Sequence, residues 1–106
     1  MLCSGRGAVF VGALTLDLLL GDVHSLKEKR SVVRPIIADL RRRFEVAAAE
    51  TGHADLHRRA LIGVAVVAGD SGHCVDVLSA AERAVADRPE VELLSARTRL
   101  YSLEEE

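Results

Sequence analysis

Aromatic residues are scarce in this chain. Phe10, Phe44 and Tyr101 are the only three among 106 residues, and there is no tryptophan. Single-stranded RNA is often recognised by paired aromatic side chains on an exposed sheet. The strand predicted at 59–69 contains no aromatic residue, so we expect RNA contact through cationic groups instead.

Cysteine is equally scarce. Cys3 and Cys74 are the only two, and neither lies in a C-x-x-C motif, which excludes a disulfide scaffold. We expect both thiols to be reduced in a cytoplasmic protein, and the sequence leaves a Cys3–Cys74 disulfide open.

The chain also lacks a hydrophobic run long enough for a membrane span. The apolar stretch 8–20 is interrupted by Asp17 and falls short of the roughly 20 residues that a span requires. No small-x-small cleavage site follows Leu20, so a signal peptide is not indicated. We interpret the stretch as a buried strand and predict a cytoplasmic location without a membrane partner.

Motifs for common cofactor and catalytic sites are missing too. There is no phosphate-binding P-loop, dinucleotide fingerprint or nucleophile elbow. His53 and His57 are four residues apart, but they lie in a predicted loop without a third metal ligand. We therefore predict no metal, no cofactor, no catalytic residue and no enzymatic activity.

Composition predicts one small globular domain. Hydrophobic residues make up 49% and charged residues 28% of the chain, and the net charge is −2. We expect a flexible lead-in at 1–8, a single domain at 9–103 and an acidic tail at 104–106.

Hydrophobic periodicity predicts six elements. Strands are expected at 9–20, 45–51, 59–69 and 91–103, and helices at 25–43 and from Asp70 or Ser71 to about 88. Ser25 and Glu28 form a capping box, with Ser25 accepting from the Glu28 N–H and Glu28 reaching back to the Ser25 N–H. The expected apolar faces are Leu26, Val33, Ile37, Leu40 and Phe44, with Ile36 at the edge, in the first helix and Val75, Leu78, Ala81 and Val85 in the second.

This β-α-β-β-α-β order predicts a ferredoxin-like α+β fold. Two right-handed crossovers place both helices on one face of a four-stranded antiparallel sheet with strand order 4-1-3-2. The other face carries Val9, Val11, Ala13 and Leu19, together with either the odd or the even positions of the third strand. Because an uncovered apolar face usually finds a partner, we predict a homodimer through this open face or an edge strand.

The first helix is strongly basic. Residues 25–44 hold seven basic and two acidic side chains, a net charge of +5 in a chain of net charge −2. Lys27, Arg30, Arg34 and Arg41 fall close together on a helical wheel, and Arg58 and Arg59 are expected to extend the patch. A cationic stripe is typical of contact with a phosphate backbone, and a solvated helix face gives the same pattern.

The segment 21–34, read G-D-V-H-S-L-K-E-K-R-S-V-V-R, resembles the signature of the YlxP-like family of small uncharacterised bacterial proteins. The resemblance continues at 11–18, 55–60 and 62–67. It implies a ferredoxin-like fold and no established activity. It also implies a gene neighbourhood of translation and ribosome maturation, beside ribosome-binding factor A.

The residues of the family signature that match here are His24, Ser25, Lys27, Glu28, Lys29 and Arg30. Ser25 and Glu28 are explained as caps. The nucleic-acid contacts that we predict are His24, Lys27, Lys29, Arg30, Arg34 and Arg41.

The expected function is therefore that of a non-enzymatic RNA- or ribosome-associated factor, with rRNA or a ribosomal subunit as the partner. The alternative is a dimeric regulatory domain that binds a small molecule at its interface.

Overall fold

A computed structural model describes residues 7–104 of the chain. The flexible lead-in and acidic tail that we predicted lie largely outside these residues. In chain order the elements are β1 (Ala8–Leu20), α1 (Leu26–Phe44), β2 (Ala47–Gly52), β3 (Arg59–Ala68), α2 (Ser71–Ala86) and β4 (Val91–Glu104). All six predicted elements are present, with ends displaced by one or two residues.

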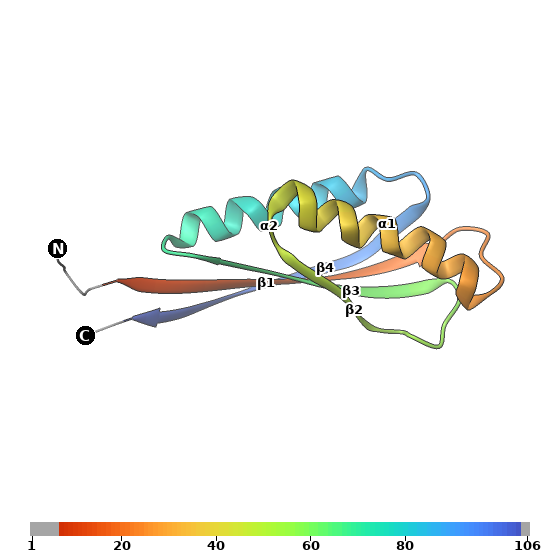
Figure 1. Ribbon diagram of the computed structural model, residues 1–106, viewed down its shortest axis with the longest axis horizontal. Coiled ribbons are helices and arrows are strands. Elements are labelled where there is room, and N and C mark those ends of the chain that lie inside the picture. The colour runs from red at the N-terminus through yellow and green to blue at the C-terminus, as the bar shows by residue number, and fades with distance from the viewer. Residues whose placement is uncertain (1–6, 105–106) are drawn as a thin grey trace.

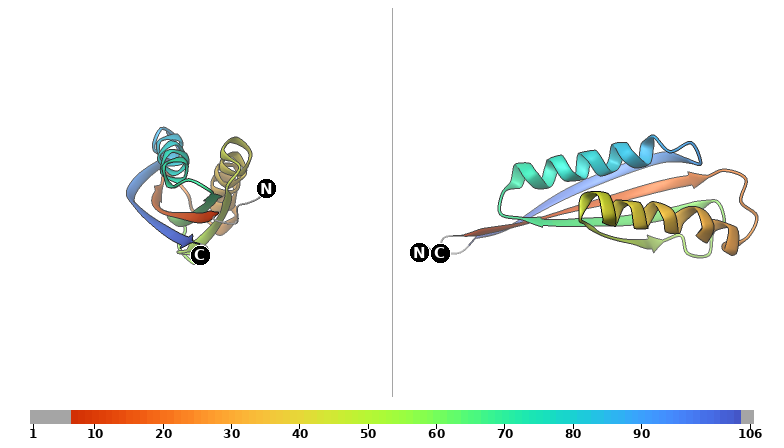
Figure 2. Two further views of the ribbon diagram at one scale, coloured as in Figure 1. Left: turned by 90° about the vertical axis from the view of Figure 1, so that its left-hand side faces the viewer. Right: turned by 45° about the horizontal axis from the view of Figure 1, so that its top comes forward.

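The four strands form one antiparallel sheet with the order β2-β3-β1-β4. Both helices cover the same face of this sheet, as Figures 1 and 2 show. Helix α2 packs over β1, β3 and β4, and α1 packs beside α2 and over β2. The ferredoxin-like α+β prediction is confirmed, including the central position of β1 and β3, the two most apolar strands.

The core lies between the helices and one face of the sheet. Every second residue of β1 from Leu14 to Leu20 is buried, because alternate side chains of a strand point to the same face. The facing positions of β3, Ala60 to Val66, are buried as well. Val67 instead lies on the uncovered face and is 68% exposed.

The helix faces differ in detail from those predicted. The buried stripe of α1 consists of Lys29, Val33, Ile36 and Leu40, so Ile36 lies at its centre and Ile37 at its edge. In α2 the buried stripe begins at Cys74, whereas Val75 is 44% exposed. Helix α2 is therefore turned slightly from the predicted orientation, and the Cys74 thiol lies beside the backbone carbonyl of Phe10.

Gly12 allows α2 to approach β1 closely. A Cβ atom at residue 12 would lie 2.8 Å from Leu78 Cδ1 and 3.3 Å from both Cys74 Cβ and Val66 Cγ1. A larger side chain has no room unless the helix moves away from the sheet.

The uncovered face of the sheet is defined by the odd-numbered residues of its two central strands. An irregularity between Asp17 and Leu18 shifts the pairing of β1 with β4, which places Ser95, Arg97, Arg99 and Tyr101 on this face. Beyond the helices, the ends of β1 and β4 continue as a ribbon (Figure 1). Its open side carries the exposed side chains of Val9, Tyr101 and Leu103. The homodimer remains a prediction.

Neither helix in residues 7–104 combines the length and hydrophobicity that crossing a membrane requires.

Replacing Gly12 with valine is expected to destabilise the protein by about 1–3 kcal/mol, because the added methyl groups overpack the contact between α2 and β1. Gly7→Val is the control, since a Cβ at residue 7 has no neighbour within 4 Å. Urea unfolding of the two variants measures the difference. Equal transition midpoints would contradict the close packing at Gly12.

Candidate nucleic-acid interface

Local interactions at both ends set the limits of helix α1. The Ser25 side chain accepts a hydrogen bond from the Glu28 N–H at 3.1 Å, as predicted. The Glu28 carboxylate accepts from the His24 N–H at 2.8 Å, rather than from the Ser25 N–H that we expected. At the other end Glu45 adopts a left-handed conformation with φ 53°, and its N–H bonds to the Arg41 carbonyl.

Lys27, Arg30 and Arg34 are three of the four residues of the predicted stripe, and we call these three the α1 stripe. The spacing of three and four residues places them on one side of the helix, within about 10 Å along its axis. All three are exposed, and none forms an ion pair or side-chain hydrogen bond in the part of the chain that the structure describes. Together with Ser31 and Pro35 they line a shallow hollow on the helix surface. Their cationic groups are free to meet an external anion.

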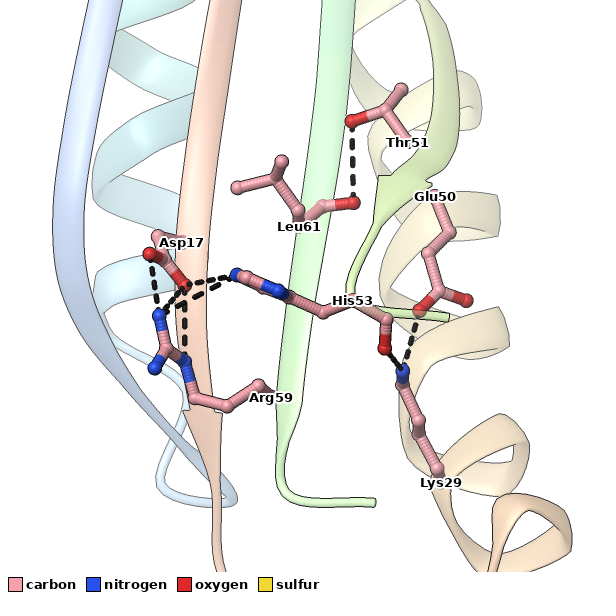
Figure 3. Close-up of polar contacts among 7 residues, drawn as sticks. All are labelled: Asp17, Lys29, Glu50, Thr51, His53, Arg59 and Leu61. Atoms are coloured by element: carbon pink, nitrogen blue, oxygen red, sulfur yellow. Dashed lines mark hydrogen bonds and ion pairs between the residues drawn. The ribbon is translucent and has the colours of Figure 1, made fainter. Parts of the chain in front are cut away.

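Lys29 does not belong to this surface, which corrects the prediction. Its side chain is 3% exposed, and its ammonium lies 2.7 Å from the Glu50 carboxylate of β2. The same ammonium donates to the His53 carbonyl at 2.6 Å (Figure 3). A buried ammonium requires such partners, because removing the charge from water is costly. Lys29 therefore attaches α1 to the end of β2 and has no access to RNA.

His24 and Arg41 lie at opposite ends of the helix and have partners within the protein. The His24 ring is 2.6 Å from the Asp22 carboxylate, and both side chains are well exposed. The Arg41 guanidinium donates to the Ala48 carbonyl of β2 at 2.7 and 3.1 Å. Arg41 thus reaches toward the edge of the sheet, away from the α1 stripe.

The other arginines near α1 are also engaged. Asp39 forms ion pairs with Arg42, Arg43 and Arg88 at 2.8–3.3 Å. The net charge of +5 counted along the helix therefore overstates the free charge. Within the described residues, the three cations of the α1 stripe make neither an ion pair nor a side-chain hydrogen bond, whereas Arg41 has no acidic partner but donates to the Ala48 carbonyl.

Arg58 and Arg59 do not extend the stripe, contrary to our expectation. Arg58 donates to the carbonyls of Leu20 and Gly21 at 3.2 and 2.9 Å, and so secures the end of β1. Arg59 binds both carboxylate oxygens of Asp17, with its terminal nitrogen 2.8 and 2.7 Å from them. Both arginines act within the fold.

Asp17, Arg59 and His53 form a polar cluster on the open face of the sheet (Figure 3). His53 Nε2 lies 3.5 Å from the Asp17 carboxylate, and His53 has the left-handed φ of 59° that is uncommon for a residue with a side chain. Hydrogen bonds from the Arg59 guanidinium, aided by its positive charge and by His53, lower the pKa of Asp17. Sequence spacing did not indicate this cluster, because its three members come from separate elements.

The described residues offer no cluster of three or more potential metal ligands. His57 is exposed in the β2–β3 loop, whereas the His53 ring turns to Asp17. The pair of histidines four residues apart does not form a shared ligand set.

Comparisons with known proteins agree with the family resemblance. A family model described as "Protein of unknown function (DUF503)" matches residues 11–98. The chain is 28% identical to the "Uncharacterized protein YlxP" of Bacillus subtilis (strain 168) over 91 residues, which cover 86% of this chain and 99% of that protein. Among solved structures, it is similar to the de novo designed protein Foldit4 at a TM-score of 0.45 and 9% identity, covering 93% of this chain and 99% of that one.

Replacing Lys29 with methionine is expected to destabilise the fold by about 1–3 kcal/mol, because the His53 carbonyl and the Glu50 carboxylate lose their common donor. Lys27→Met on the exposed side of the same helix is the control and is expected to change stability by less than about 0.5 kcal/mol. Urea unfolding at neutral pH compares the two. A Lys29 variant as stable as the Lys27 variant would show that the buried pair contributes nothing.

Stability is expected to depend on Asp17 in acid. Because the pKa of Asp17 is lowered in the folded state, its ionised form stabilises the fold at neutral pH, and this contribution is lost as the pH falls below about 4. The difference in unfolding free energy between wild type and Asp17→Asn should therefore be largest near pH 7 and shrink in acid. Asp55→Asn, at an exposed loop position, is the control. A difference that does not change with pH would refute the role of the Asp17–Arg59 pair.

Proposed function

The chain belongs to the DUF503 family of proteins of unknown function, and we propose that it is a non-enzymatic RNA-associated factor that binds the phosphate backbone of structured RNA through the α1 stripe. The observation that carries the proposal is the exposure of Lys27, Arg30 and Arg34 without acidic partners on a protein of net charge −2. Such local concentration of positive charge on an acidic molecule favours contact with a polyanion at this surface.

The arrangement favours recognition of shape and charge over sequence. A nucleic-acid duplex carries one phosphate for about every 1.7 Å of its axis, so several phosphates fall within the length of the stripe. Guanidinium groups bind phosphate oxygens bidentately, and Arg30 and Arg34 supply two of them. No aromatic side chain lies among the residues lining the α1 hollow, which supports contact with the backbone and not with the bases.

Association with ribosomes is the finer part of the proposal. It relies on the gene neighbourhood that the family resemblance implies, whereas the geometry supports the phosphate contact alone. The alternative of a dimeric regulatory domain with a ligand at its interface remains a prediction, to which the exposed apolar side chains of Val9, Val67 and Leu103 lend support.

Reversing two charges of the stripe, Arg30→Glu/Arg34→Glu, should weaken binding to a duplex RNA and reduce the slope of log K against log salt by about 2. Both side chains are exposed, so the fold is expected to persist. Binding is measured by fluorescence anisotropy at several salt concentrations, and cosedimentation with ribosomal subunits tests the finer proposal.

Arg42→Glu/Arg83→Glu is the matched control, because it changes the net charge equally at exposed positions outside the α1 stripe. If both double variants weaken duplex binding to the same extent, net charge accounts for the effect and the α1 stripe is not the binding surface.

A further inference from the structure

The open face of the sheet contains a second group of cations, Arg97 and Arg99 of β4, which no sequence motif indicates. In the observed register, Arg99 of β4 lies beside Ala13 of β1, and Arg97 lies beside Thr15. Continuing across the sheet, Ala13 is followed by Ala65 and Ala47, and Thr15 by Gly63 and Ala49. Two adjacent rows therefore each begin with an arginine and continue with three small residues.

Small side chains leave this part of the face hollowed. Three hollows of about 600, 500 and 300 Å³ all include Thr15, and they extend over β1 toward β4, β2 and the Asp17 cluster respectively. We call this combined depression, with Arg97 and Arg99 at its β4 side, the open-face trough. From β2 to β4 it spans three strand spacings, or about 14 Å.

The charge of the trough favours an anion. Arg97 and Arg99 are exposed, and neither makes a hydrogen bond or ion pair with another residue of the described chain. Arg41 lines the hollow on the β2 side. Asp17 is the acidic residue lining these hollows, and Arg59 already binds both of its carboxylate oxygens.

A flat aromatic group completes the trough. Tyr101 lines the same hollow as Arg97 and Arg99 and is 51% exposed. Its ring is therefore accessible for stacking with a nucleic-acid base, and the planar guanidinium groups beside it stack in the same way.

We propose that the open-face trough binds a single strand of RNA, with Arg97 and Arg99 on its phosphates and Tyr101 stacked on a base. This inference deepens the proposed function and rests on it for the class of ligand. A second copy of the chain fits this part of the face less well, because Arg97 and Arg99 would have to be desolvated against a surface whose acid, Asp17, is already paired. Both helices cover the other face of the sheet (Figure 2), so Arg30 and Arg34 of the α1 stripe can be changed separately from Arg97 and Arg99 of the trough.

The test measures binding of a fluorescein-labelled octauridylate and of an RNA duplex to the full chain by anisotropy over a range of salt. Arg97→Gln/Arg99→Gln should weaken octauridylate binding and reduce the slope of log K against log salt by about 1.4, the value for two phosphate contacts on a single strand. Tyr101→Leu should weaken it about tenfold with an unchanged slope, because stacking involves no counterion release. Duplex affinity should be unchanged in both.

The controls separate the two surfaces. Arg42→Gln/Arg83→Gln, with the same change of net charge, should retain octauridylate binding. Arg30→Glu/Arg34→Glu should weaken duplex binding and leave single-strand binding unchanged. If the protein does not bind octauridylate, or if the Arg97/Arg99 variant and the control variant bind it equally well, the proposal that the trough binds RNA is wrong. The proposal for the α1 stripe is unaffected by either result. Light scattering measures whether the chain forms a dimer. If it does, and if Arg97→Gln/Arg99→Gln abolishes or strengthens that dimer, the trough is an interface with a second copy and the inference is wrong.

Discussion

The buried ammonium of Lys29 determines how helix α1 lies on the sheet. A charge in that position must be paired, and its two partners, the Glu50 carboxylate and the His53 carbonyl, belong to the end of β2 and the following loop. Once Lys29 points inward, the helical repeat directs Lys27, Arg30 and Arg34 outward. The same contact fixes the backbone of His53, whose ring then reaches Asp17 on the open face. One side chain thus links the orientation of the helix to the polar cluster of the sheet.

Many of the described arginine side chains form hydrogen bonds or ion pairs with other residues of the protein. Arg58 binds carbonyls at the end of β1, Arg59 binds Asp17, and Asp39 gathers Arg42, Arg43 and Arg88. Among the described residues, the cations without an ion pair or side-chain hydrogen bond form two groups, the α1 stripe and the pair Arg97 and Arg99 on the β4 side of the open face, and Arg83 of α2 is a further, isolated one. A net charge of −2 conceals these two cationic surfaces, because opposite charges elsewhere cancel them in the sum but not in space.

Much of the fold was predictable because its signals are local. The alternation of β1, the Ser25 cap and the Asp70 cap depend on residues within a few positions of one another. The apolar faces of the helices were predicted less well. A pattern of apolar residues alone omits Lys29, and it therefore places the centre of the buried face of α1 near Ile37 instead of at Ile36. Yet Lys29 precedes Val33 by four residues, the same spacing that separates Ile36 from Leu40. This helical spacing was the feature of the sequence that could have predicted a buried Lys29.

The candidate surfaces, like the fold, were predictable from the sequence only where their signals are local. Sequence by itself determined the topology, the strand order and the basic character of α1, because periodicity, caps and composition act along the chain. Only the tertiary structure decided which cations are free. Whether Lys29, Arg41 or Arg59 meets a carboxylate or carbonyl depends on strands far away in the sequence. The face of Arg97 and Arg99 likewise depends on a register shift opposite Asp17 and Leu18, since one residue of displacement turns every following side chain to the other side of the sheet.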